Sequence, residues 1–190
     1  GREAVKYLPY ALPLSATSDG SYRTTTIADQ AAFYNPTGSS GTQLSNGVAR
    51  VTTPFSVTGF ESSPLDRILE QGASGDPWQL TGTTGLSATP GHTVKTDYLS
   101  IAANEVPLWN VNSSGAAATA AYAANTLYKT VSKDENWTSG KTGTTEEFKD
   151  LQGHVVLKRV WKDESTSLST YYVFDDYNNL SYVIPPRVTA

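Results

Sequence analysis

The sequence predicts a mainly β domain of antiparallel hairpins arranged as a meander, with one short helix; the alternative is a closed β-sandwich. Tyrosine, threonine and valine are abundant and favour strands, while 15 glycines and 10 prolines supply turns. A short pattern also recurs near the end of the chain after 26 residues. In each copy an aromatic residue precedes an aspartate by two positions, and glycine or asparagine, which readily adopt positive φ, follows three positions later. These positions are Phe148, Asp150 and Gly153 in the first copy and Phe174, Asp176 and Asn179 in the second.

Residues 1–125 are expected to form a β-rich region with the short helix near 26–35. The helical pattern is clearest over 26–34, where Thr26 can cap the helix and Pro36 ends it. This helix should lie as a cover on a sheet. The strands of the region are expected at 3–11, 46–57, 92–101 and 105–111.

Two stretches of this region lack a clear strand pattern. Residues 72–90 are rich in glycine, serine and threonine and are predicted to form a long exposed loop. Residues 113–124 are rich in alanine, which favours a helix, but their flanks are equally typical of a hairpin tip. Both interpretations of the second stretch stay open.

Residues 126–190 are predicted to form hairpin repeats in one antiparallel meander. Polar turns separate the strands at 134–140 and 162–166, and Pro185 with Pro186 stops the last strand. The strands are expected at 127–132, 142–148, 155–161, 168–174 and 180–184.

Weaker copies of the repeated pattern occur elsewhere in the chain. The segment that starts at Arg2 aligns with the one that starts at His154, as though the chain began halfway through a repeat. In a degenerate copy Asp66 aligns with the turn residue Gly153. Aspartate can occupy this position, since it tolerates the left-handed region better than most residues. Arg67 then aligns with His154 as a polar residue that flanks the turn.

The repeated pattern resembles the YD repeat of RHS proteins, which are large bacterial secreted or surface polypeptides. Most of the remaining chain is similar to the uncharacterised domain that precedes the RHS repeats in such proteins. The family usually has Tyr, Gly and Arg at three positions of the repeat. The first copy has Phe148, Gly153 and His154 there, and the second has Phe174, Asn179 and Leu180, so both copies depart from the family pattern. The segments that carry the resemblance are 1–10, 30–34, 60–65, 103–106, 127–131, 133–136, 143–150, 169–176 and 184–186.

The resemblance implies a non-enzymatic structural module that forms or caps part of a β shell around a C-terminal cargo, often a toxin. Its partners would be neighbouring RHS repeats of the same polypeptide and that cargo, and its location would be secreted or at the cell surface. The chain contains no methionine, which together with the half repeat at its start predicts one continuous fragment of a larger protein.

The residues predict no catalytic site, cofactor or metal site. A net charge of −4 offers no basic surface for nucleic acid, and no apolar run approaches the roughly 20 residues of a membrane helix. His92 and His154 are the only histidines, cysteine is absent, and no G-x-S-x-G elbow occurs. The adjacent carboxylates of Glu146 and Glu147 would point to opposite faces of a strand and could not act as an acid pair.

Two binding roles remain to be weighed. A carbohydrate-binding surface module is the alternative function, because Trp137, Trp78 and Trp109 could stack on sugars if they lined one groove. Aromatic residues of β proteins more often form core or cross-strand pairs, and Trp137 has the strongest case because it lies in a turn. Asp175 and Asp176 offer oxygen ligands for calcium but can equally build the turn itself.

Overall fold

The structure is a computed structural model that describes residues 2–11, 21–35, 47–86 and 88–186. The chain divides into two compact units, Gly1–Val94 and Lys95–Ala190. The predicted boundary between residues 125 and 126 falls inside the second unit. Strand pairs are antiparallel, the sheet does not close into a barrel, and the described residues contain one α-helix. The prediction of a mainly β fold of hairpins with one short helix is therefore confirmed.

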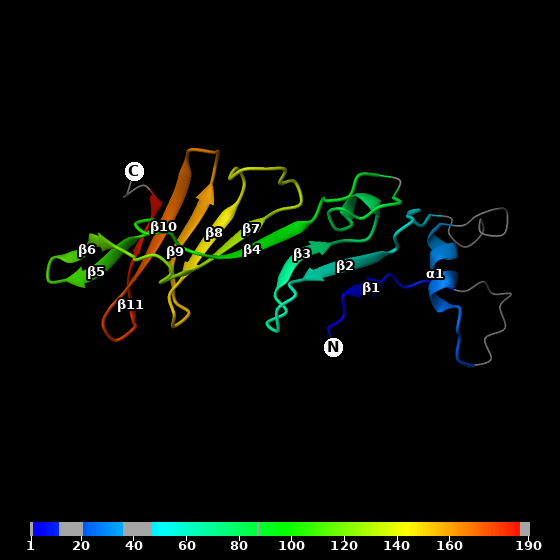
Figure 1. The fold of residues 1–190 in the computed structure, drawn as a ribbon, viewed down its shortest axis with the longest axis horizontal. Coiled ribbons are helices and arrows are strands. Elements are labelled where there is room, and N and C mark those ends of the chain that lie inside the picture. Colours follow the sequence, from blue (N-terminus) through cyan, green and yellow to red (C-terminus); the bar gives the residue numbers. More distant parts are fainter. Residues whose placement is uncertain (1, 12–20, 36–46, 87, 187–190) are drawn as a thin grey trace. The chain divides into compact units, whose positions relative to one another are not determined.

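The first unit contains a sheet in the order β1-β2-β3 (Figure 1). The two strands predicted in this unit, at 3–11 and 46–57, are both shorter in the structure. The first is shorter because its pairing with β2 ends at Tyr7, opposite Phe55. The second begins only after Pro54, which leaves residues 47–54 irregular and residue 46 outside the described part. The strands are β1 (Val5–Tyr7), β2 (Phe55–Phe60) and β3 (Ile68–Gly72).

Helix α1 (Thr26–Tyr34) has the predicted bounds, although Pro36, its expected stop, lies outside the described residues. Thr25 occupies the N-cap position instead of Thr26, and its hydroxyl donates to Asp29 at 2.9 Å. The buried Gln30 side chain donates from Nε2 to the backbone oxygens of Leu8 at 2.9 Å and Pro54 at 2.7 Å. The Pro54 oxygen also accepts from the backbone N–H of Leu8, so the helix joins the adjoining ends of β1 and β2 through backbone carbonyls of both segments (Figure 1).

The segment predicted as an exposed loop over 72–90 is instead partly buried. It contains a short 3-10 helix, η2 (Asp76–Trp78), which folds the chain back against the sheet. The buried Gln79 side chain donates to the backbone oxygens of Phe55 and Ala73. A Cβ atom on Gly72 would collide with the carbonyl oxygen of Trp78, so this close approach requires glycine.

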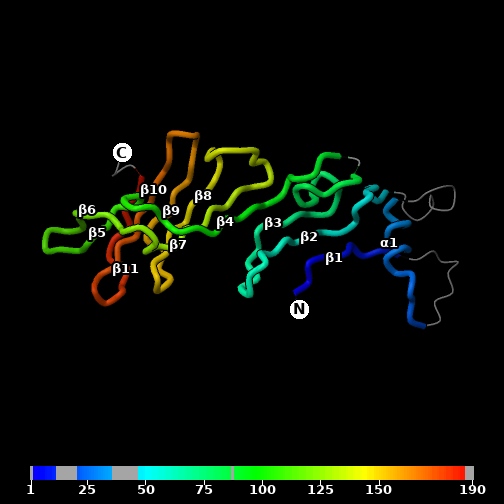
Figure 2. Tube along the Cα trace, in the orientation of Figure 1, coloured from blue at the N-terminus to red at the C-terminus, as the bar shows by residue number. Residues whose placement is uncertain are grey.

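The second unit contains the predicted meander, with β4, β7, β8, β9, β10 and β11 in that order (Figure 2). Strands β9 and β11 have the bounds that the sequence predicted. The bounds are β4 (Val94–Ser100), β7 (Tyr128–Lys133), β8 (Thr145–Lys149), β9 (Val155–Trp161), β10 (Ser167–Phe174) and β11 (Leu180–Ile184).

The stretch over 113–124, for which a helix and a hairpin tip were both open, belongs to a separate hairpin of β5 (Pro107–Asn112) and β6 (Gly115–Ala121), with the turn at residues 113–114. Trp109 of β5 packs against Tyr171 of β10 with ring centroids 5.7 Å apart. The hairpin thus covers the face of the meander that carries the core. The core residues are Ile101, Val106, Leu127, Phe148, Val156, Leu157, Tyr171, Val173 and Ile184.

Candidate functional site

The turn between β8 and β9 is organised by one carboxylate. Asp150 Oδ1 accepts hydrogen bonds from the backbone N–H groups of Gln152 at 2.9 Å and His154 at 2.8 Å. The backbone N–H of Asp150 donates to the His154 carbonyl at 3.0 Å, and Gly153 has a φ of 93°. Glycine adopts this conformation without steric cost. An acid at the start of the turn and a left-handed residue near its end therefore define the turn.

The turn between β10 and β11 has the same construction, but with Asp175 as the acid. Its Oδ1 accepts from the backbone N–H groups of Tyr177 at 2.9 Å and Asn179 at 2.8 Å. Asn178, with a φ of 65°, is the left-handed residue. Asp175 thus corresponds to Asp150, and Asn178 to Gly153.

This equivalence corrects the repeat predicted from sequence by one residue. The sequence pattern aligned Asp176 and Asn179 with the first turn, whereas the hydrogen bonds align Asp175 and Asn178, with a spacing of 25 residues. The doublets Asp-Asp and Asn-Asn allow either register in the sequence. The backbone donors select Asp175, and Asp176 takes no part in these bonds.

The turn between β2 and β3 repeats the design with a longer acid and two more residues. Glu61 Oε1 accepts from the backbone N–H of Arg67 at 3.3 Å, and the Glu61 N–H donates to the Arg67 carbonyl at 2.9 Å. Asp66 has a φ of 49°. The predicted alignment of Asp66 with Gly153, and of Arg67 with His154, is therefore confirmed.

Each of the three turns also follows a shift in strand register next to the acid. The shifts lie between Gly59 and Phe60, between Phe148 and Lys149, and between Val173 and Phe174. Phe174 therefore corresponds to Phe60 and Lys149, while Phe148 corresponds to Val173. The two aromatic residues of the predicted repeat occupy different positions: Phe148 is fully buried in the core, and Phe174 lies next to the turn.

The remaining carboxylate oxygen ties the two sides of each turn together. Asp150 Oδ2 lies 3.0 Å from His154 Nδ1, and Asn179 Nδ2 donates to Asp175 Oδ2 at 3.2 Å. In the first unit the guanidinium of Arg67 donates to both Glu61 oxygens, at 2.7 and 2.8 Å. Such a fork is the strongest of the three links, because both of its hydrogen bonds are charge-assisted.

Two residues that precede a strand also contact the aromatic ring before a later turn. The His154 ring stacks on Phe174 with centroids 4.7 Å apart and an interplanar angle of 28°. The guanidinium of Arg2 lies over Phe60 at 5.5 Å, and Arg2 also forms an ion pair with Asp66. The contact of Arg2 with Phe60 thus parallels that of His154 with Phe174, in line with the alignment of these residues in the sequence.

We expect removal of the Asp175 carboxylate to weaken the second unit, and removal of its neighbour to leave stability unchanged. Asp175→Ala loses two backbone hydrogen bonds and a side-chain bond, whereas Asp176→Ala loses none of them. The measurement is the urea midpoint of each variant. A larger loss for Asp176→Ala would restore the register that the sequence suggested.

The Glu61 carboxylate is expected to titrate far below its ordinary value. Hydrogen bonds from the Arg67 side chain, followed by one from Ser63, lower the pKa of Glu61 from 4.5 to about 2. A folded pKa below the unfolded one means that ionised Glu61 favours folding above pH 4.5, and this contribution is lost as the pH falls towards 2. Carbon-13 NMR titration measures this pKa. Arg67→Gln should raise it towards 4.5, and an unchanged value would contradict the assigned cause.

A buried charge network lies on the covered face of the meander. Glu146 of β8, which is 5% exposed, accepts from Lys129 Nζ at 2.8 Å and from Arg159 Nη1 at 3.0 Å. Glu105 binds the same Lys129 ammonium at 2.7 Å. Two carboxylates and two cations therefore compensate one another, which fits a structural role better than proton transfer.

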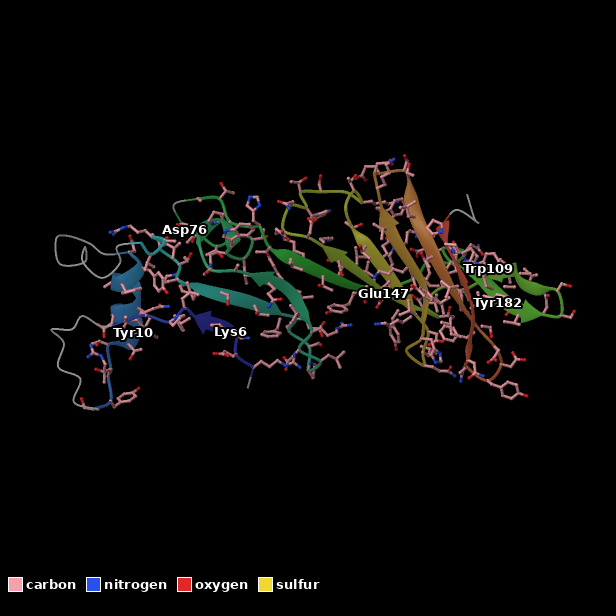
Figure 3. The ribbon with its side chains drawn as sticks, turned by 180° about the vertical axis from the view of Figure 1, so that it is seen from behind. Lys6, Tyr10, Asp76, Trp109, Glu147 and Tyr182 are labelled. Atoms are coloured by element: carbon pink, nitrogen blue, oxygen red, sulfur yellow. The ribbon has the colours of Figure 1, made fainter. Side chains whose placement is uncertain are left out.

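The three tryptophans predicted to bind sugars lie on separate elements. Trp109 packs into the core of the second unit (Figure 3), and its indole nitrogen is buried without a hydrogen-bond partner. Trp137 folds back over the β7–β8 turn, where its indole N–H donates to Gly140 at 3.1 Å and Lys133 covers its ring at 4.4 Å. Trp78 belongs to the first unit and lies beside His92. Sugar stacking by these residues stays a prediction.

A shallow cavity of about 280 Å³ lies beside Trp78 in the first unit. Asp76 in its wall is 5% exposed, and one of its carboxylate oxygens accepts hydrogen bonds from the hydroxyls of Thr52 and Thr53 (Figure 3). Arg50, Asn35 and Ser74 are the other polar residues of the lining. The cavity combines an aromatic wall with polar groups, a composition suited to a small polar ligand.

The described part of the chain holds neither a cluster of potential metal ligands nor a helix that could span a membrane. No group of three or more potential metal ligands occurs among the residues that the structure describes, and Asp175 already serves its turn. No helix in that same part has the length and hydrophobicity needed to cross a membrane.

Comparison with known proteins gives one match. No curated protein matches the chain, and no solved structure matches it either. Residues 1–90, just under half of the chain, match a family described as Domain of unknown function (DUF6443). This match covers β1, α1, β2, β3 and η2, so the first of the two compact units is the part that is similar to this family.

Proposed function

We propose that the chain is a non-enzymatic structural module of a large secreted or surface protein of RHS type. In this role it forms or caps part of a β shell that encloses a C-terminal cargo. Neighbouring repeats of the same polypeptide and the cargo are the proposed partners. The match to a family of unknown function over residues 1–90 is consistent with this proposal but does not specify it.

The recurrence of one turn design carries the proposal. An acid at the strand end, a left-handed residue and a polar residue that closes the turn occur in three hairpins of two compact units. The YD repeat that the sequence resembles places Asp, Gly and Arg at these same three positions. In an array of hairpins such a turn fixes the strand register at each repeat, which is a mechanical function and not a catalytic one.

The proposal is tested in the parent polypeptide by deleting residues 1–190 and measuring how fast an added protease cuts the C-terminal region. If the module closes the shell, the deletion should expose the cargo and accelerate its cleavage. A parent carrying Asp176→Ala is the matched control, because this side chain lies outside the turn bonds. Unchanged shell assembly and unchanged cargo protection after the deletion would refute the proposal.

A carbohydrate-binding surface module is the second candidate, and one observation favours it. The cavity beside Trp78 places an indole ring, which is 39% exposed, near the cation of Arg50. A glycan array with the intact chain and a Trp78→Ala variant tests this candidate. Retention of a glycan by the intact chain alone would support it, whereas no retention by either chain would remove it.

A further inference from the structure

The last strand of the second unit presents an unusually unprotected edge. No described strand pairs with the outer side of β11. All five residues of β11 are uncharged, and Leu180, Tyr182 and Val183 are 52%, 42% and 51% exposed. Native edge strands are normally blunted by charge, proline, bulges or extreme shortness. In β11 the prolines that follow Ile184 and the register shift at Ser181 are the features that limit pairing. Strand β9 has the same register shift and still pairs with β10 on its far side.

The edge strand of the first unit is protected in these ways. Strand β1 has only three residues, its central residue is Lys6, and the charged Arg2 and Glu3 precede it. The two edges therefore differ in the property that decides whether an additional strand can bind. The edge at β11 lacks the charged residues that protect β1.

The internal repeat identifies what fits on β11. A shift of 25 residues aligns the β10–β11 hairpin with the β8–β9 hairpin. In this alignment β11 corresponds to β9. The far side of β9 is occupied by β10, with Leu157 opposite Tyr171, Lys158 opposite Thr170 and Arg159 opposite Ser169. The corresponding acceptor positions on β11 are Tyr182, Val183 and Ile184.

The turn residue Asn179 adds a second contact point. It occupies the position of His154, whose ring stacks on Phe174 at the end of the strand that pairs with β9. An added strand in the same register would bring its last residue next to Asn179. The planar amide of Asn179 is held in place by its hydrogen bond to Asp175.

We infer that the outer edge of β11 is a docking edge for one antiparallel strand with the side-chain pattern of β10. In the bound register a tyrosine of the added strand lies opposite Tyr182, and an aromatic residue lies beside Asn179. This inference rests on the proposed function and deepens it, since it names the edge at which the sheet is extended. Main-chain hydrogen bonds supply the affinity, and the paired side chains fix the register.

The inference is tested by extending the chain with its own repeat. A second copy of residues 162–186 is joined directly after Pro186, which supplies one loop, one copy of β10, one turn and one copy of β11. Amide hydrogen exchange is then followed by NMR for the β11 amides of the original copy that point away from β10. We expect these amides to exchange at least tenfold more slowly than in the unextended chain.

The matched control carries the same extension with proline at the copied positions of Thr170 and Tyr172, which cannot complete a strand ladder. It should leave the exchange of β11 unchanged. Equal exchange in the extended chain, the control and the unextended chain would overturn the inference. A dimer of the unextended chain whose β11 amides are already protected would also overturn it, because a second copy would then be the occupant.

The outcome is separable from that of the shell experiment. Docking is measured on the isolated chain, whereas cargo protection is measured on the parent polypeptide. Loss of cargo protection on deletion, combined with unchanged exchange at β11, would reject the docking edge and keep the proposed function. Slower exchange at β11, combined with unchanged cargo protection after the deletion, would keep the docking edge and reject the proposed function.

Discussion

Replacing Phe148 with alanine is expected to lower the free energy of unfolding of the second unit by about 4 kcal/mol. Phe148 is fully buried in the middle of the meander, where β7 and β9 flank it and two cations lie over its ring. The substitution removes the transfer free energy of the ring and leaves a cavity that strands paired on both sides cannot close.

The measurement is urea unfolding followed by tryptophan fluorescence in a Trp78→Phe background, so that the signal comes from the second unit. Tyr128→Ala is the matched control, because Tyr128 lies on the neighbouring strand and is 60% exposed. It should change the free energy by less than about 0.5 kcal/mol. A loss below about 1 kcal/mol for Phe148→Ala would show that this residue does not anchor the core.

Replacing Glu146 with alanine is expected to cost about 3 kcal/mol. The carboxylate lies between Lys129 and Arg159, and its removal leaves Arg159 without its ion-pair partner on the covered face. Desolvation of an uncompensated buried charge is the main cause of the loss. Glu105 remains bound to Lys129, so the loss should fall at the low end of the range for broken buried pairs.

The neighbouring Glu147 gives the matched control for this experiment. It pairs with Lys149 near solvent on the other face of β8 (Figure 3), and Glu147→Gln should cost less than about 0.5 kcal/mol. Glu146→Gln retains the shape of the side chain and should give an intermediate loss. Equal effects of Glu146→Ala and Glu147→Gln in urea unfolding would contradict the structural role of the network.

The local elements were largely readable from the sequence. The bounds of α1, β9 and β11 follow from helical spacing, from alternation and from the proline stop after Ile184, because these signals act within a few residues. The stretch over 113–124 was ambiguous because alanine favours a helix in isolation. Pairing of β6 with β5 and packing on the core select the strand there.

The candidate site was only partly readable. Asp150 and Gly153 were identified because an acid followed by glycine is a strong turn signal. Asp175 and Asn178 were missed by one residue, since Asp176 and Asn179 satisfy the same pattern. Glu61 was missed as well, and its signal is an acid directly after a strand with a left-handed residue further on.

The sequence alone determined the mainly β class, the position of the helix, the meander of the C-terminal region and the existence of a repeated turn. All of these depend on residue types and spacings along the chain. The tertiary structure decided the register of the repeat, the burial of Glu146 between two cations, and the use of α1 to close strand ends. Each of these depends on which donor meets which acceptor across the sheet, and several residues of the same type compete for each position.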